Sequence, residues 1–157
     1  MYQHHSLIYF LLVPILVGGL FETIGSSQNL HSLGEYNPVL DAWNNLDNDG
    51  VLSTGTTQAV ALVESAESSL RGYVVGGVFN YLNHTSSSIS FGNIAYYNQT
   101  SQNWQPLGGG CNGGITNIVV APIVNGNCSS TSPCYSIIVS GHFDVCFHKS
   151  AYSILYK

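Results

Sequence analysis

Two histidines and one cysteine lie close together near the C-terminus and have the side chains of a metal site. His142, Cys146 and His148 occur within "GHFDVCFH", and imidazole and thiolate are preferred ligands of zinc. No fourth ligand follows at a standard spacing, and a cysteine in an oxidising compartment is expected to form a disulfide. We therefore expect no metal here, a disulfide at Cys146, and loop or surface positions for both histidines.

A second stretch carries oxygen ligands at alternating positions. In "NNLDNDGVLSTG" the side chains of Asn45, Asp47 and Asp49 precede a glycine, as in a loop that wraps a calcium ion. The position where a bidentate glutamate belongs is Thr56, so the pattern is incomplete. A turn between strands is the favoured interpretation, and a calcium-dependent adhesive module is the alternative.

Glycoside hydrolysis needs two carboxylates that flank the scissile bond, and the chain has eight acidic residues. They are Glu22, Glu35, Asp41, Asp47, Asp49, Glu64, Glu67 and Asp144. Asp144 follows the same short phrase as Asn80, which gives it a structural position, and Glu64 and Glu67 stand beside serines, as in a solvated loop. No G-x-S-x-G turn and no lysine-containing phosphate loop occurs. We expect no catalytic residue and no cofactor.

Four aromatic residues could form a platform for sugar or protein contact: Tyr73, Tyr96, Tyr97 and Trp104. Neighbouring residues of a strand point to opposite faces, so at least one of Tyr96 and Tyr97 belongs to the core. Because aromatic residues in strands mostly serve packing, a structural role is the favoured interpretation.

Three N-glycosylation sequons support export of the chain. They begin at Asn83, Asn98 and Asn127, and we expect glycans at all three. Single sequons arise by chance in a chain rich in asparagine, so the three support export without deciding it.

The four cysteines all lie in the last third of the chain. In an exported protein an even number indicates two disulfides, for which three connectivities are possible. Because Cys128 and Cys134 flank the turn-like stretch "SSTSP", we pair them with each other and Cys111 with Cys146.

The composition bounds the class of protein. Of 157 residues, 7% are charged and 45% are hydrophobic, and the net charge is −5. The low charge is therefore compatible with a packed core. Only Arg71, Lys149 and Lys157 are basic, so no patch exists to neutralise phosphates, and we exclude nucleic acid as a partner.

An apolar stretch, "LIYFLLVPILVGGLF", occupies residues 7–21 without a charge. It is shorter than the roughly 20 residues of a membrane span, and its position is typical of the h-region of a secretory signal peptide. Its weak points are an n-region without Lys or Arg and the lack of an A-x-A cleavage site. We assign residues 1–22 to a signal helix outside the fold, with an uncleaved anchor and a buried core helix as alternatives.

The rest of the chain must position these groups, and its pattern is that of short strands. Residues 23–42 are polar with few apolar positions in period. Beyond them, β-branched and aromatic residues form segments that Gly, Asn and Ser separate. The expected strands are 56–65, 72–80, 92–99, 103–109, 115–124, 134–144 and 151–157. A short helix within "AVALVESAESSL" is the one competing interpretation.

An internal repeat organises these strands. Trp104 follows Trp43 by 61 residues, and each begins the pattern W-x-x-L. Phe143 follows Phe79 by 64 residues, and each ends the pattern G-x-F. Ile94 matches Ile154 in the same order, so three landmarks recur at nearly one period. Each unit would hold four antiparallel strands, which is the plan of a propeller blade.

Packing accounts for these landmarks. Glycines in a central strand, such as Gly76 and Gly77, let a neighbouring sheet approach closely. The phenylalanine two residues later can fill the gap between adjacent sheets. The tryptophan supplies a broad apolar ring on the outer strand, and "LGGG" allows a tight reversal into the next unit.

The residues "YVVGGVFN…NIAYYNQTSQNWQPLGGGCNGGITNIVV" resemble repeats of kelch-like and delta-type propellers. They look most similar to the extracellular repeats of fungal-type cell-surface polarity glycoproteins, in which "GG-x-F", "N-I-A-x-x-N" and "W-x-x-L-G-x-G" recur in that order. The resemblance covers residues 72–157 well and 43–71 weakly. It implies an extracellular or cell-surface protein, often anchored by a C-terminal membrane helix.

We therefore expect an all-β chain with an incomplete propeller-type repeat of four-stranded antiparallel blades after an N-terminal signal helix. Residues 43–157 would hold one complete and two partial blades, and the chain would be the N-terminal piece of a longer protein. The expected function is a non-catalytic extracellular or cell-surface scaffold with a role in polarity or wall morphogenesis, binding an extracellular protein or carbohydrate. The membrane would be reached only through an uncleaved N-terminal segment or a C-terminal anchor. The alternative is a fragment of a secreted propeller enzyme, a carbohydrate oxidase or glycoside hydrolase, whose active site lies in other blades.

Overall fold

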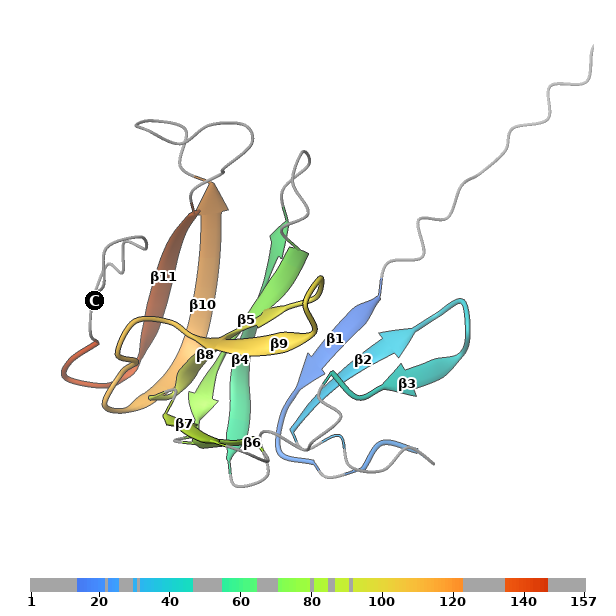
Figure 1. Cartoon of the computed structure of the whole chain (residues 1–157), viewed down its shortest axis with the longest axis horizontal. Helices are drawn as coiled ribbons and strands as arrows, with labels where there is room; N and C mark the ends of the chain where they lie inside the picture. Colours follow the sequence, from blue (N-terminus) through green and yellow to red (C-terminus); the bar gives the residue numbers. More distant parts are fainter. Residues whose placement is uncertain are drawn as a thin grey trace, which may run out of the picture.

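The computed structural model describes residues 14–21, 23–25, 30, 32–46, 55–64, 71–79, 81–84, 87–90, 92–122 and 135–146. Within these residues the chain forms strands and no helix (Figure 1). The strands are β1 (Ile15–Gly18), β2 (Leu33–Asn37), β3 (Ala42–Asn44), β4 (Thr56–Glu64), β5 (Arg71–Val78), β6 (Tyr81–His84), β7 (Ser87–Ser90), β8 (Ile94–Asn98), β9 (Asn103–Pro106), β10 (Gly114–Pro122) and β11 (Tyr135–His142). The all-β class is confirmed, and in this part of the chain no helix has the length and apolarity to cross a bilayer.

The sheets are antiparallel and have two to four strands each. β4, β5, β8 and β9 form the central sheet in that order, as the sequence predicted for one repeat unit. β1–β2–β3 form the N-terminal sheet, β10–β11 form the C-terminal sheet, and β6–β7 form a separate hairpin. Figure 1 shows the N-terminal and C-terminal sheets on opposite sides of the central sheet. The described sheets do not close into a propeller.

The central sheet is buried on both faces because its side chains alternate between two hydrophobic clusters. Val74 of β5 and Ile94 of β8 belong to the cluster shared with the C-terminal sheet. Their neighbours Val75 and Ala95 belong to the cluster shared with the N-terminal sheet. All four are fully buried. A strand with both faces covered needs apolar residues at consecutive positions, which explains the uninterrupted "VV" of β5.

Glycine permits the close approach of these sheets. A Cβ added at Gly76 of β5 would lie 2.7 Å from Cγ2 of Ile115 and 2.9 Å from Cδ1 of Ile118 in β10. The same relation occurs at the other face, where a Cβ at Gly18 of β1 would lie 2.5 Å from Cγ2 of Thr57 in β4. The expectation that glycine lets adjacent sheets approach is therefore confirmed, and the molecule uses this contact twice.

The structure of the N-terminal apolar stretch differs from the expected signal helix. The expected signal helix is not seen at residues 14–21, because Ile15–Gly18 form strand β1 and pair with β2 from Ile15 opposite Tyr36 to Gly18 opposite Leu33. Leu16 packs against the cluster that holds Val75. Residues 15–18, which the sequence interpretation placed outside the fold, therefore belong to it. Residues 1–13 lie outside the described residues.

Residues 15–21, "ILVGGLF", are a third copy of the repeated phrase "YVVGGVF" at 73–79 and "IIVSGHF" at 137–143. The backbone bonds agree: the Gly19 amide donates to the Ser32 carbonyl at 3.0 Å, as the Gly77 amide donates to Asn93 at 3.1 Å. The apolar run therefore combined a repeat strand with the residues before it, which produced the appearance of one h-region.

β2 and β3 repeat β8 and β9, although residues 23–42 gave no strand signal. Tyr36 pairs with Trp43 as Tyr97 pairs with Trp104, and the ring centroids lie 5.2 and 5.1 Å apart. The turns match as well, because the side-chain oxygen of the asparagine that ends β2 or β8 accepts two backbone amides beyond it. The residue before each following strand has a positive φ, 47° in one copy and 52° in the other.

The C-terminal sheet repeats the first half of the central sheet. β4 and β5 shift register between Thr57 and Ala59, and β10 and β11 shift between Ile115 and Asn117. The bulged pair ends at a glycine in both cases, since Thr57 lies opposite Gly77 and Ile115 opposite Gly141. The repeat thus extends to an irregularity that no periodic pattern predicts.

The remaining expectations on secondary structure have mixed outcomes, and one of them falls outside the described residues. The competing helix in "AVALVESAESSL" is wrong for residues 59–64, which belong to β4. The hairpin of β6 and β7 was not predicted. The expected strand at 151–157 lies outside the described residues. The assumed boundary between residues 42 and 43 falls within β3.

Candidate functional site

A polar cluster connects the N-terminal sheet to the central sheet. The Tyr73 hydroxyl of β5 donates to Oε2 of Glu35 in β2 at 2.6 Å. Gln99, just after β8, donates from Nε2 to the Tyr73 hydroxyl at 2.6 Å and to Glu35 Oε2 at 3.3 Å. The side-chain Nδ2 of Asn44 in β3 donates to Glu35 Oε1 at 3.5 Å. Because each sheet supplies side chains, the cluster exists only when the two sheets are stacked.

Tyr73 is the most perturbed titratable group of this cluster. Burial raises the pKa of Tyr73 well above its ordinary value of 10.0, and the hydrogen bond to the Glu35 carboxylate raises it further. The phenol therefore stays protonated and donates to the carboxylate. Its ring stacks on Tyr97 with planes 6° apart and centroids 6.5 Å apart. A neutral phenol held between two sheets is suited to fixing them together, and it is a poor nucleophile or base.

Asn93 forms a second polar connection within the buried interior. Its side chain accepts from the Phe79 amide and donates to the Cys111 carbonyl, each at 2.9 Å. Ser32, its counterpart in the preceding unit, donates to the Gly55 carbonyl at 2.9 Å. Both residues adopt a positive φ, 66° and 69°. Each therefore attaches the end of one sheet to the segment that leads into the next.

The pairing of Cys111 with Cys146 is confirmed as a disulfide. It joins the residues before β10 to those after β11, and Asn112 supports the same junction by accepting the amides of Asp144 and Val145 at 2.9 and 3.0 Å. The second expected pair, Cys128 with Cys134, lies outside the described residues.

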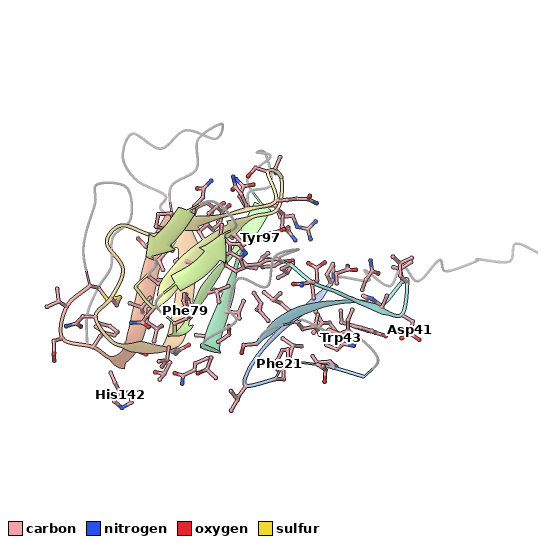
Figure 2. All side chains as sticks on the ribbon, turned by 60° about the horizontal axis from the view of Figure 1, so that its bottom comes forward. Phe21, Asp41, Trp43, Phe79, Tyr97 and His142 are labelled. Atoms are coloured by element: carbon pink, nitrogen blue, oxygen red, sulfur yellow. A yellow bond between two sulfur atoms is a disulfide. The ribbon has the colours of Figure 1, made fainter. Side chains whose placement is uncertain are left out.

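Of the sequence candidates for a metal site, the structure describes Asn45, His142 and Cys146. Cys146 is in the disulfide, which confirms that expectation, and His142 projects from the exposed end of β11 (Figure 2). His148 lies outside the described residues, as do Asp47 and Asp49 of the calcium interpretation. Within the described part of the chain, no group of three or more His, Cys, Asp or Glu side chains could hold a metal ion.

Glu35 and Asp41, two of the described acids, accept hydrogen bonds from tyrosine hydroxyls. Glu35 accepts from Tyr73, and Asp41 in the β2–β3 turn accepts from the Tyr36 hydroxyl at 2.6 Å. This hydrogen bond is the main cause of a raised pKa at Tyr36. Asp144 is exposed beside the disulfide. Glu22, Asp47, Asp49, Glu67 and the Glu64 side chain lie outside the described residues.

The proposed aromatic platform is absent because its members are packed. Tyr73, Tyr96 and Tyr97 are 5%, 7% and 7% exposed, and Trp104 is half-buried against Tyr97. Tyr96 faces the cluster shared with the C-terminal sheet, while Tyr97 faces the cluster shared with the N-terminal sheet. The packing interpretation is therefore confirmed, and both members of the Tyr96–Tyr97 pair are core residues.

The three sequons have different surroundings. Asn83 lies in β6, and Asn127 lies outside the described residues. Asn98 ends β8, and its side-chain oxygen accepts the amides of Thr100 and Ser101 at 2.9 and 3.1 Å. A turn therefore accounts for this asparagine without a glycan, as it does for Asn37 in the preceding unit. Glycosylation at the three positions stays a prediction.

The sequence analysis missed two apolar faces at the ends of the sheet stack. The outer face of the C-terminal sheet presents Val119 and Ile138, which lie opposite each other and are 50% and 39% exposed. The outer face of the N-terminal sheet presents Ile15, which is 54% exposed and lies opposite Tyr36. Figure 2 places Trp43 on the N-terminal sheet, where its ring contacts Tyr36. Alignment of "VGGLF" with "VGGVF" was the signal that would have revealed these end positions.

Comparison of the chain with family models, with curated proteins and with solved structures finds no match. No relative therefore contributes to the functional argument.

Proposed function

We propose that the chain is a non-catalytic, exported scaffold module built from propeller-type sheets, with a role at the cell surface in polarity or wall morphogenesis. The main support for this proposal is the repeated contact between neighbouring sheets, in which Gly18 lies against Thr57 and Gly76 lies against Ile115. Residues that recur in the sequence serve packing in both copies, and such repetition is typical of proteins that present extended surfaces.

Export is supported by the disulfide between Cys111 and Cys146, because such bonds persist in oxidising compartments. The scarcity of charge agrees with a surface that contacts neutral partners, an extracellular protein or carbohydrate. In the Glu35–Tyr73–Gln99 cluster, the Tyr73 hydroxyl and the Gln99 amide nitrogen donate to the Glu35 carboxylate between two sheets, and the same nitrogen donates to the Tyr73 hydroxyl. This arrangement supports an architectural use of the cluster.

Expression of the full chain in a eukaryotic secretory host tests the proposal. We expect the protein in the medium or on the cell surface, with Cys111 and Cys146 linked in peptide mapping and a mobility shift after glycosidase treatment. A protein that stays in the cytosol with reduced thiols would refute export.

An assay for peroxide release and for new reducing ends, on a panel of oligosaccharides, tests the absence of catalysis. We expect neither product. Turnover that disappears in Glu35→Gln, while Asp41→Asn retains it, would replace the scaffold with the enzyme alternative.

A further inference from the structure

The turn between β2 and β3 carries two neighbouring aliphatic side chains that are open to solvent. Val39 and Leu40 are 66% and 68% exposed, and among the described large hydrophobic residues only Leu20 is more exposed. We call these two residues the aliphatic pair. A single exposed aliphatic residue is ordinary on a protein surface, but turns favour Gly, Pro, Asn, Asp and Ser, so two in succession in a turn need a reason.

The counterpart of this turn shows that its backbone does not need aliphatic residues. Asn98 ends β8 as Asn37 ends β2, and each asparagine accepts the amides two and three residues further on. In the turn after β8, Thr100 and Ser101 stand in the places of the aliphatic pair. The same turn therefore forms with polar residues, and the aliphatic pair serves something other than the turn.

The exposure of the turn does not depend on whether a further sheet covers the N-terminal sheet. The N-terminal sheet covers the central sheet, yet Thr100 and Ser101 in the turn of the central sheet are exposed. In Figure 1 the β2–β3 turn likewise lies at the end of its sheet, beyond the strands. Exposure is therefore a property of the place that this turn has in each unit.

The residues beside the aliphatic pair are those found at the surface of a bilayer. One register position behind the turn, the rings of Tyr36 and Trp43 contact each other with centroids 5.2 Å apart. Tyrosine and tryptophan are enriched where acyl chains meet headgroups. The one charged residue of the turn, Asp41, accepts from the Tyr36 hydroxyl at 2.6 Å, which holds its carboxylate beside the strand. Figure 2 shows Asp41 and Trp43 at this end of the N-terminal sheet.

The chain enters the N-terminal sheet at the same end. β1 begins at Ile15, which lies opposite Tyr36 and is 54% exposed. The preceding residues 7–13, "LIYFLLV", are apolar and uncharged. The chain that leads into this end of the sheet is therefore apolar as well.

We infer that this end of the N-terminal sheet binds the surface of a lipid bilayer. The aliphatic pair inserts among the acyl chains, and the rings of Tyr36 and Trp43 lie at the level of the headgroups. The lipid is zwitterionic, because the net charge is −5 and no Lys or Arg occurs between residues 15 and 44 to bind an anionic headgroup. The inference goes beyond the proposed function, since it concerns a direct membrane contact and does not depend on a scaffold role.

Flotation of the purified full chain with phosphatidylcholine vesicles tests the inference. We expect wild type to float with the vesicles at low and high salt alike, and no better when phosphatidylserine is added. The double variant Val39→Thr with Leu40→Ser should lower the partition coefficient at least about tenfold. It introduces the residues that the counterpart turn carries at 100 and 101, so it should fold, which near-ultraviolet circular dichroism checks.

The matched control is Val119→Thr with Ile138→Thr, which removes two exposed aliphatic side chains from the outer face of the C-terminal sheet. We expect it to bind as wild type does. In a Trp104→Phe variant, phosphatidylcholine brominated on its acyl chains should quench the fluorescence of Trp43.

A wild type that stays with the solution, or a turn variant that floats as wild type does, would overturn the inference. An equal loss in the control would show unspecific adsorption and overturn it as well. Binding that requires phosphatidylserine would refute the zwitterionic partner, and self-association without vesicles that the turn variant loses would show a protein contact in place of the membrane. An exported chain that does not float would leave the proposed function intact.

Discussion

Gly76 of β5 faces Ile115 of β10 so closely that a Cβ at residue 76 would lie 2.7 Å from the Ile115 Cγ2. This distance is shorter than an ordinary carbon–carbon contact, so a side chain at residue 76 would force Ile115 or its sheet to shift. The relation is local in space and distant in sequence, and it recurs at Gly18. It therefore gives the most direct test of the stacked architecture.

Gly76→Ala should destabilise the protein by roughly 1 to 3 kcal/mol through overpacking, measured by urea unfolding. Gly19→Ala is the matched control, because the nearest atom to its added Cβ is 3.3 Å away in the Phe21 ring. The double variant Gly76→Ala with Ile115→Val should recover part of the loss. Equal stability of Gly76→Ala and wild type would contradict the close contact.

Leu16→Asp should unfold or strongly destabilise the chain, because Leu16 packs against the cluster shared with the central sheet. Leu20→Asp should change stability by no more than about 0.5 kcal/mol, since Leu20 is 87% exposed. Both substitutions place the same charge in the same apolar run. Thermal unfolding of refolded protein distinguishes the two roles: a removable signal segment predicts equal behaviour, and strand β1 predicts unequal behaviour.

Replacing both Cys111 and Cys146 by serine should lower the free energy of unfolding. The disulfide joins residues 35 apart in sequence, and the chain-entropy model assigns about 4 kcal/mol to a loop of that size. Denaturant titration of the double variant, with wild type under reducing conditions for comparison, measures the loss. A change below about 0.5 kcal/mol would mean that the hydrogen bonds of Asn112 hold the junction without the disulfide.

Stability should fall above about pH 10 because of Tyr73. Its folded pKa is raised, mainly by burial and then by Glu35, so the unfolded chain loses this proton first. The contribution is complete below the unfolded pKa and declines as pH rises, by at most about 1.4 kcal/mol per pH unit for one proton. In Tyr73→Phe the decline should be shallower by that amount. Parallel stability–pH curves for variant and wild type would show that Tyr73 ionises normally.

The central sheet could be predicted from sequence because its strands are long, rich in Val, Ile and Tyr, and separated by turn residues. β2 and β3 could not, because they are short and because Glu35 is a polar residue that faces the interior. Its partner Tyr73 lies 38 residues away, so no local pattern predicts their hydrogen bond. β1 was missed for the opposite reason: its apolar residues continue an apolar run, which hid the repeated glycines.

Some features of the candidate site could likewise be predicted from the sequence, and others could not. The Cys111–Cys146 pair followed from the position of four cysteines along the chain. The burial of Tyr96 and Tyr97 on opposite faces followed partly from strand alternation, which predicts opposite directions but does not say that both faces are covered. That second fact depends on the stacking of whole sheets, which no single strand encodes.

The matched contacts at Gly18 and Gly76 also bear on how such a chain can change in length. Each repeat unit presents one face to the sheet before it and the opposite face to the sheet after it. Duplication or loss of one whole unit would therefore leave the remaining inter-sheet contacts unaltered. A gain of half a period would instead pair two surfaces that do not match. Variation by tandem duplication in complete periods is therefore the mutational route that this architecture tolerates.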